Sequence, residues 1–259
     1  MGVSIVVTSG KGGVGKTTTT ANLGTALAAL GKNVVVVDGD TGLRNLDVLM
    51  GLENRIVYTI IDVIENRCRL KQALIKDKRY PNLCLLPTAQ TKDKDDIRAQ
   101  DMFDLVNKLK EEFDYVLIDS PAGIEQGFTY ASSIADEAII VVNLDLATLR
   151  DNDRVIGLLL KKGIQDLKLI INKVNLDDIE DGKSLTIDDA LDILSLPLLG
   201  IVYEDHEMIE ANNKGRPVYL LKGHLLHDCF DNIAHRLLGH KRAFAKCKRR
   251  GLLSRIFLG

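Results

Sequence analysis

The chain has 259 residues, is 46% hydrophobic and carries a formal net charge of −2, so it can bury one substantial core, as a single α/β domain does. No apolar run reaches the roughly 18 residues of a membrane-spanning helix, and the four widely spaced cysteines offer no C-x-x-C pair for zinc or an iron–sulfur cluster. We therefore expect reduced thiols and, because the first predicted strand begins at once, no cleavable targeting peptide.

A glycine-rich loop follows the first predicted strand, Val3–Val7. The loop and the Lys-Thr pair that ends it match G-x-x-x-x-G-K-[ST], and apolar or small residues at helical spacing continue to Gly31. Such a loop turns its N–H groups toward an anion at the positive end of the helix, which favours a phosphate site over a glycine turn without a ligand. The predicted phosphate-binding residues are Gly10, Lys11, Gly12, Gly13, Val14, Gly15, Lys16, Thr17 and Thr18. Lys16 is placed for the β- and γ-phosphates and Thr17 for Mg²⁺.

Two carboxylates follow the second predicted strand, Asn33–Val37. Asp38 and Asp40 come at its carboxyl end, which is the edge of a parallel sheet where ligands bind. We expect Asp38 to order the water shell of Mg²⁺ and Asp40 to orient the attacking water. The alternative is that both are turn-forming aspartates.

A third acid ends the apolar strand Tyr115–Asp119, in the pattern of a Walker B motif. Asp119 is therefore expected to hold Mg²⁺ through water. Gly123, shortly after it, supplies backbone freedom for a loop that moves as the γ-phosphate comes and goes.

The remaining elements alternate between strands and helices. Strands are predicted at Leu83–Leu86, Glu137–Val142, Leu167–Ile171 and Leu198–Val202, and helices at Ile60–Ile64, from a cap at Asp95 or Asp96 to about Glu112, from Arg150 onward, and at His224–Leu238. This order predicts an α/β fold of the P-loop NTPase type, with a mostly parallel twisted sheet flanked by helices.

The sequence Asn172-Lys173-Val174-Asn175 bears on the choice of base. A GTPase places Asp at the fourth position, where its carboxylate accepts from the guanine N1 and N2 groups. Asn175 cannot supply that carboxylate, so adenine is the better fit.

Charge is distributed unevenly along the chain. No acidic residue follows Asp231, whereas eight of the 34 cations do, so the first 231 residues hold 26 cations against all 36 acids. A basic C-terminus of this kind requires an anionic partner.

The last nine residues have an amphipathic pattern. At 100° per residue, Leu252, Leu253, Ile256 and Phe257 form one apolar stripe. With the cations before them they predict a helix lying in an anionic membrane surface, and the alternative is a helix packed on the protein's own core. We therefore divide the chain into a P-loop ATPase domain (residues 1–240) and a basic linker with a membrane-targeting helix (residues 241–259).

The loop also carries a second lysine, Lys11, and the pattern K-G-G-x-G-K-[ST] at residues 11–17 resembles that of the deviant Walker A (MinD/ParA) family of ATPases. In that family the extra lysine reaches the phosphates bound by a partner subunit. The resemblance therefore implies an ATP-dependent homodimer with Lys11, Lys16 and Asp40 as catalytic residues and ATP and Mg²⁺ as cofactors. It also implies that Asn172 contacts adenine.

Residues 41–52, 120–125 and the tail resemble the septum-site branch of that family, apart from departures at Asn143-Leu144-Asp145 and Tyr203-Glu204-Asp205. This branch implies an ATPase that helps to place the division septum. It would lie in the bacterial cytoplasm or plastid stroma, peripherally on the inner face of the membrane.

The implied partners are an anionic membrane surface, a division-inhibitor protein (MinC-like) docked near Asp151 and Asp153, and an ATPase-stimulating topological factor (MinE-like). Nucleic acid is not expected. Asp151 and Asp153 are equally explained as acids near a helix N-terminus, where the dipole favours them.

Three rivals remain. A ParA-type DNA-partition ATPase would use a basic surface without the apolar stripe, and its DNA affinity would fall steeply with salt. A non-catalytic scaffold would bind nucleotide without hydrolysing it. An iron–sulfur carrier of the same fold is disfavoured by the cysteine spacing.

Overall fold

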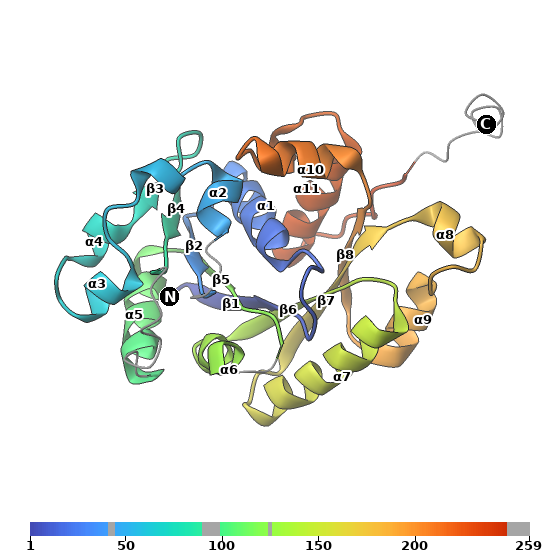
Figure 1. Ribbon diagram of the computed structural model, residues 1–259, viewed down its shortest axis with the longest axis horizontal. Helices are drawn as coiled ribbons and strands as arrows, with labels where there is room; N and C mark the ends of the chain where they lie inside the picture. The colour runs from blue at the N-terminus through green and yellow to red at the C-terminus, as the bar shows by residue number, and fades with distance from the viewer. Residues whose placement is uncertain (41–44, 90–98, 124–125, 248–259) are drawn as a thin grey trace.

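The computed structural model describes residues 1–40, 45–89, 99–123 and 126–247. These residues form an eight-stranded sheet with the order β3-β4-β2-β5-β1-β6-β7-β8 (Figure 1). The strands are β1 (Val3–Thr8), β2 (Val34–Asp38), β3 (Ile75–Lys76), β4 (Leu83–Leu86), β5 (Tyr115–Asp119), β6 (Glu137–Val142), β7 (Asp166–Val174) and β8 (Leu198–Tyr203). Only the short β3 pairs antiparallel among the described strands, so the predicted mostly parallel sheet is confirmed.

Helices cover both faces of this sheet (Figure 1). They are α1 (Lys16–Ala29), α2 (Leu46–Met50), α3 (Ile60–Ile64), α4 (Leu70–Ala73), α5 (Ala99–Glu112), α6 (Gln126–Ser133), α7 (Leu146–Lys161), α8 (Leu176–Glu180), α9 (Ile187–Leu194), α10 (His206–Asn213) and α11 (Leu225–Leu237). Short 3₁₀ turns lie at Glu53–Arg55 and Val218–Leu220.

The strands are buried on both sides, which is why their sequences are almost continuously apolar. Successive side chains of β1 point to opposite faces, so Val6 joins one core cluster and Ile5 and Val7 join the other. The first cluster includes α5, α7 and α9, and the second includes α1 and α11. The sheet is therefore a rigid central layer whose carboxyl edge can hold side chains in fixed positions.

Helix α7 begins earlier than predicted. The sequence predicted a helix opening at Arg150, but α7 starts at Leu146, because Asp145 caps it by accepting from the Thr148 N–H. Asp151 and Asp153 consequently lie beyond the first turn. Their interpretation as N-terminal helix acids is therefore wrong.

Other predicted boundaries agree within one to three residues. The predicted strand Leu167–Ile171 extends from Asp166 to Val174, and the helix predicted at His224–Leu238 is α11, with His224 as its cap. The predicted caps Asp95 and Asp96 lie outside the described residues. So do Leu252, Leu253, Ile256 and Phe257. In the part of the chain that the structure describes, no helix combines the length and apolar character needed to cross a bilayer.

Residues 241–247, which we call the strap, pack on the rest of the chain beside the edge strand β8. The Arg236 guanidinium donates to the carbonyls of Leu198 and Leu199 on β8 (2.8 and 2.9 Å) and to the Arg242 carbonyl of the strap (2.9 Å). It also lies over the ring of Phe244, 4.3 Å from the centroid. The Tyr203 hydroxyl donates to the Ala245 carbonyl at 3.1 Å.

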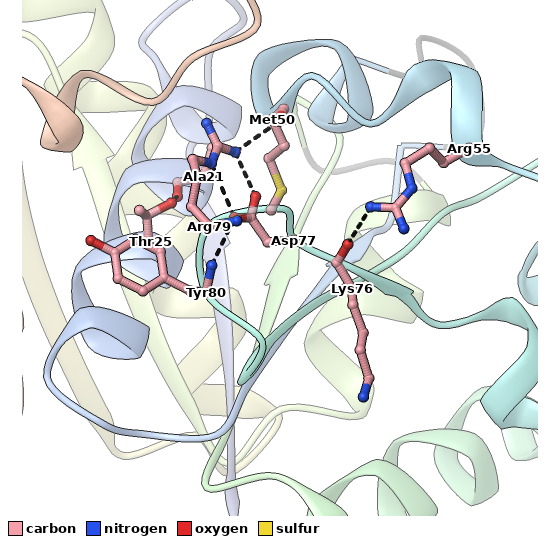
Figure 2. A network of polar contacts seen from close by, with 8 residues as sticks. All are labelled: Ala21, Thr25, Met50, Arg55, Lys76, Asp77, Arg79 and Tyr80. Atoms are coloured by element: carbon pink, nitrogen blue, oxygen red, sulfur yellow. Dashed lines mark hydrogen bonds and ion pairs between the residues drawn. The ribbon is translucent and has the colours of Figure 1, made fainter.

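A polar network fixes the end of α2, the helix that follows the Asp38-Gly39-Asp40 turn (Figure 2). Asp77, whose side chain is fully buried, accepts from Arg79 Nε at 3.0 Å, and Arg79 Nη2 donates to the Met50 carbonyl at 2.9 Å. Burial alone would raise the pKa of Asp77, but the hydrogen bonds and charge of Arg79 hold it below the ordinary 3.8. Nearby, Arg55 Nη1 donates to the Lys76 carbonyl at 2.8 Å.

We predict that Arg79→Ala lowers the free energy of unfolding by about 3 kcal/mol at pH 7, because it leaves the Asp77 carboxylate buried without a cation. A depressed folded-state pKa stabilises the fold above the unfolded value of 3.8, and this stabilisation is lost as the pH falls. Urea unfolding should therefore show a smaller difference from the wild type at pH 3, below that unfolded value, than at pH 7.

The matched control is Lys71→Ala, which removes an exposed ion pair to Glu112 at 3.8 Å and should cost less than about 0.5 kcal/mol. An Arg79→Ala effect of equal size at both pH values would contradict this account of the network.

Candidate functional site

The glycine-rich loop joins β1 to α1 at the carboxyl edge of the sheet. Gly15 has φ of 100° as the residue before α1, a conformation that strains other side chains, and a Cβ there would lie 2.2 Å from Asn172 Nδ2. Gly13, with φ of 74°, also lies in the left-handed region. The loop therefore leaves no room for a side chain at Gly15, whereas Gly13 has open space around it and is favoured as glycine by its backbone conformation alone.

Lys16 begins α1 and is 7% exposed. Its Nζ donates to the Lys11 carbonyl at 3.4 Å, within the loop itself. Burial lowers the pKa of Lys16, while the charges of Asp119 and Asp40 oppose that shift. The lysine therefore stands among the predicted carboxylates, as a residue that binds phosphate beside a metal must.

The two predicted metal residues lie side by side, because Asp38 and Asp119 are register partners on the neighbouring strands β2 and β5. Both are 1% exposed. Burial, and next the charge of Asp119, raises the pKa of Asp38 to about 8. Burial also raises the pKa of Asp119 to about 7, although hydrogen bonds from Thr17 and Thr20 and the charge of Lys16 oppose the shift.

These residues fit a Mg²⁺ ion that arrives with phosphate. Asp38 Oδ2 is buried and has no hydrogen-bond partner, and the Thr17 hydroxyl already contacts Asp119. Within residues 1–40, 45–89, 99–123 and 126–247, no group of three His, Cys, Asp or Glu side chains is arranged to hold a metal alone. Phosphate oxygens would therefore complete the coordination around Thr17, Asp38 and Asp119.

Asp40 lies next to this group. It is half-buried, and its N–H donates to Asp38 Oδ1 at 3.1 Å. Gly39 between them is pressed against β5, since its N–H donates to the Asp119 carbonyl at 2.9 Å and a Cβ would lie 2.6 Å from the same oxygen. The turn that carries Asp40 is therefore fixed at its start.

The predicted adenine residue, Asn172, is on β7, and its side chain contacts the glycine-rich loop. Asn172 Nδ2 donates to the Val14 carbonyl at 2.7 Å, and Lys173 Nζ donates to the Gly13 carbonyl at 2.8 Å. A cavity of about 880 Å³ lies beyond them, between the loops that follow β7 and β8. Asn175, Tyr203 and Glu204 line it, together with Lys246 of the strap.

The second loop lysine has a partner within its own chain. Lys11 Nζ lies 3.3 Å from Asp145 Oδ1, with the two side chains 46% and 45% exposed. Hydrogen bonds from Thr148 and Lys11 hold the pKa of Asp145 below its usual range, although burial acts in the opposite direction. The Asn143-Leu144-Asp145 departure thus supplies both the α7 cap and this ion pair.

Sequence reasoning missed two residues that hold the loop. Asn152 is fully buried on α7 and accepts from the Gly10 N–H at 3.0 Å, and Lys173 contacts Gly13 as described above. The Asn172-Lys173 pair near the end of β7 was a signal for Lys173, whereas nothing distinguished Asn152 within its run of charged residues. Asp151 and Asp153 flank Asn152 with exposed side chains, and Thr18 is half-exposed on α1.

Comparisons with known proteins agree with this geometry. Residues 5–218 match the CobQ/CobB/MinD/ParA nucleotide binding domain. The septum site-determining protein MinD of Bacillus subtilis is 52% identical over 241 residues, which cover 92% of this chain and 90% of that protein.

Solved structures give the same result. MinD in the MinC:MinD cell division complex of Aquifex aeolicus superposes with a TM-score of 0.88 at 44% identity, covering 95% of this chain and 98% of that one. MinD of Pyrococcus horikoshii, solved with Mg-ADP, gives 0.82 at 30% identity, covering 92% and 96%. The predicted family, fold, ATP and Mg²⁺ are therefore confirmed. The chain belongs to the CobQ/CobB/MinD/ParA nucleotide-binding family and, within it, to the MinD septum site-determining ATPases.

Proposed function

We propose that this chain hydrolyses ATP to ADP and phosphate as a dimer, associates reversibly with a membrane through its C-terminal residues, and helps to place the division septum. The observation that carries the proposal is the buried pair Asp38–Asp119 beside Lys16, at the end of a glycine loop. A carboxylate pair of this kind is stable in its charged form only with a cation bound. Mg-ATP supplies that cation.

Each residue of the site has a role that follows from its place. Lys16 and the loop N–H groups bind the phosphates, while Thr17, Asp38 and Asp119 hold Mg²⁺, which neutralises charge on the phosphates. Asp40 orients the attacking water from the adjacent turn. Asn172 contacts adenine through the side of its amide that does not bind Val14.

Lys11 acts on the nucleotide of a second copy. Its ion pair to Asp145 is nearly half exposed at both ends, and exposed pairs of this kind contribute about 0 to 1 kcal/mol. Lys11 can therefore leave Asp145 at little cost when a more highly charged triphosphate approaches. A cation supplied only on assembly makes hydrolysis depend on dimerisation.

The membrane is bound by Leu252, Leu253, Ile256 and Phe257 together with the basic residues before them. One such short segment binds weakly. Two segments in one dimer gain effective concentration, which multiplies the affinity by about 10² to 10⁴. ATP binding therefore promotes attachment, and hydrolysis reverses it. The protein would work peripherally on the inner face of a bacterial or plastid membrane.

The partner surface proposed for a division inhibitor is the exposed side of α7 at Asp151 and Asp153. The Aquifex aeolicus relative was solved in a complex with MinC, which supports a MinC-like partner here. A MinE-like stimulating factor is proposed from membership of the same family. The ParA-type alternative is less supported, because relatives about half identical to this chain are named MinD.

We predict that the full-length protein sediments with anionic liposomes in ATP and much less in ADP or without nucleotide. Lys16→Ala should abolish the ATP-dependent part, because the phosphates lose their buried cation. Truncation after Arg250 is the matched control, which should keep nucleotide binding and lose lipid. Equal sedimentation without nucleotide would contradict the proposal, and competition by DNA would favour the partition alternative.

We also predict that Asp40→Ala gives a dimer that forms in ATP and persists, because binding remains while the attacking water is no longer oriented. Light scattering should show the dimer for hours, and phosphate release should fall by about 10²-fold or more. Normal turnover by this variant would remove Asp40 from the mechanism.

A further inference from the structure

The two ends of the phosphate loop are held by different elements. Its second half is bound by β7, through Asn172 to the Val14 carbonyl and Lys173 to the Gly13 carbonyl. Its first half is bound by α7, through Asn152 and Asp145. The half that leads into Lys16 and the half that carries Lys11 are therefore held by different elements, although Lys16 Nζ also donates to the Lys11 carbonyl at 3.4 Å.

The Asn152 amide is used on both sides. Its Oδ1 accepts from the Gly10 N–H at 3.0 Å, and its Nδ2 donates to the Thr148 carbonyl at 2.7 Å and to Ser9 Oγ at 3.2 Å. The backbone N–H requires an acceptor and the carbonyl a donor, so only one orientation of the amide satisfies both. Asn152, Thr148 and Ser9 are all fully buried, so water is not at hand to replace the two bonds that the amide donates.

The loop backbone also presses directly on α7. A Cβ on Gly10 would lie 2.6 Å from the Asp151 carbonyl oxygen, so no side chain fits between the loop and the helix. Ser9 is fully buried as well. The place of Gly10 is therefore set by α7 at the level of Asn152.

The position of Lys11 depends on the same contacts. Its N–H donates to Ser9 Oγ at 3.4 Å, the hydroxyl that Asn152 also binds, and its Nζ contacts Asp145, the cap residue of α7. The backbone and the side chain of Lys11 are thus both positioned by contacts that lead to α7. Lys16 donates to the Lys11 carbonyl but takes no part in these contacts with α7.

We propose that Asn152 is a positioning residue for Lys11: it fixes Ser9 and Gly10 so that Lys11 leaves the loop in the direction needed to reach a second subunit. This inference rests on the proposed role of Lys11 across the dimer. On this account two steps depend on different parts of the phosphate loop. Nucleotide binding by one subunit depends on the half held by β7, whereas assembly and turnover depend on the half held by α7.

The test compares Asn152→Ala with Val155→Ala, a fully buried position on the same helix that belongs to the core cluster. Both variants lose packing, so both should unfold at lower urea concentration. Only Asn152→Ala should lower ATP turnover on anionic vesicles, by about tenfold or more, because a displaced cation is a large defect in catalysis. Its affinity for a fluorescent ATP analogue should stay close to that of the wild type. Asn152→Asp, which keeps the shape and loses the donated bonds, should show the same split.

A double-mutant cycle decides whether the effect passes through Lys11. If it does, Lys11→Ala with Asn152→Ala should turn over no more slowly than Lys11→Ala alone. Additive losses, or equal turnover by Asn152→Ala and Val155→Ala, would overturn the inference. Failure of the proposed function has a different signature, since Lys11→Ala alone would then dimerise and turn over as the wild type does.

Discussion

The site depends on two carboxylates forced together away from water. Asp38 and Asp119 are register partners on adjacent buried strands, so neither can move apart without disturbing the sheet. Their raised pKa values express the unfavourable energy of that arrangement, which Lys16 relieves only in part. The fold thus holds excess negative charge that a bound cation would balance, and Mg-nucleotide supplies such a cation.

The loop that receives the phosphates is a shared structure. Glycines allow its backbone to approach α7 at Gly10 and Asn172 at Gly15. Hydrogen bonds with the side chains of Asn152 and Asn172 then hold that flexible backbone in place. Figure 1 shows α7 and α1 on opposite faces of the sheet, in which β7 is a strand. Phosphate binding and the proposed dimerisation would therefore depend on different parts of the chain.

Sequence reasoning reached most of the fold because buried parallel strands are apolar runs. The predicted strands Leu83–Leu86, Tyr115–Asp119 and Glu137–Val142 have the observed limits. The start of α7 was missed although Asp145 and Thr148 have cap spacing. Asn152 could not have been predicted, because its contact with Gly10 joins residues 142 positions apart and depends on packing alone.

The strap has a practical consequence for how this protein is shortened. Strand β8 is the last in the sheet, and Arg236 and Tyr203 tie residues 242–245 beside it. Exposed strand edges recruit other strands and promote aggregation. Truncation at residue 240 would expose the edge of β8 and remove Phe244, which packs against the core. Poor solubility of such a fragment would then reflect damage to the folded domain. Cuts intended to remove only the tail belong after Cys247.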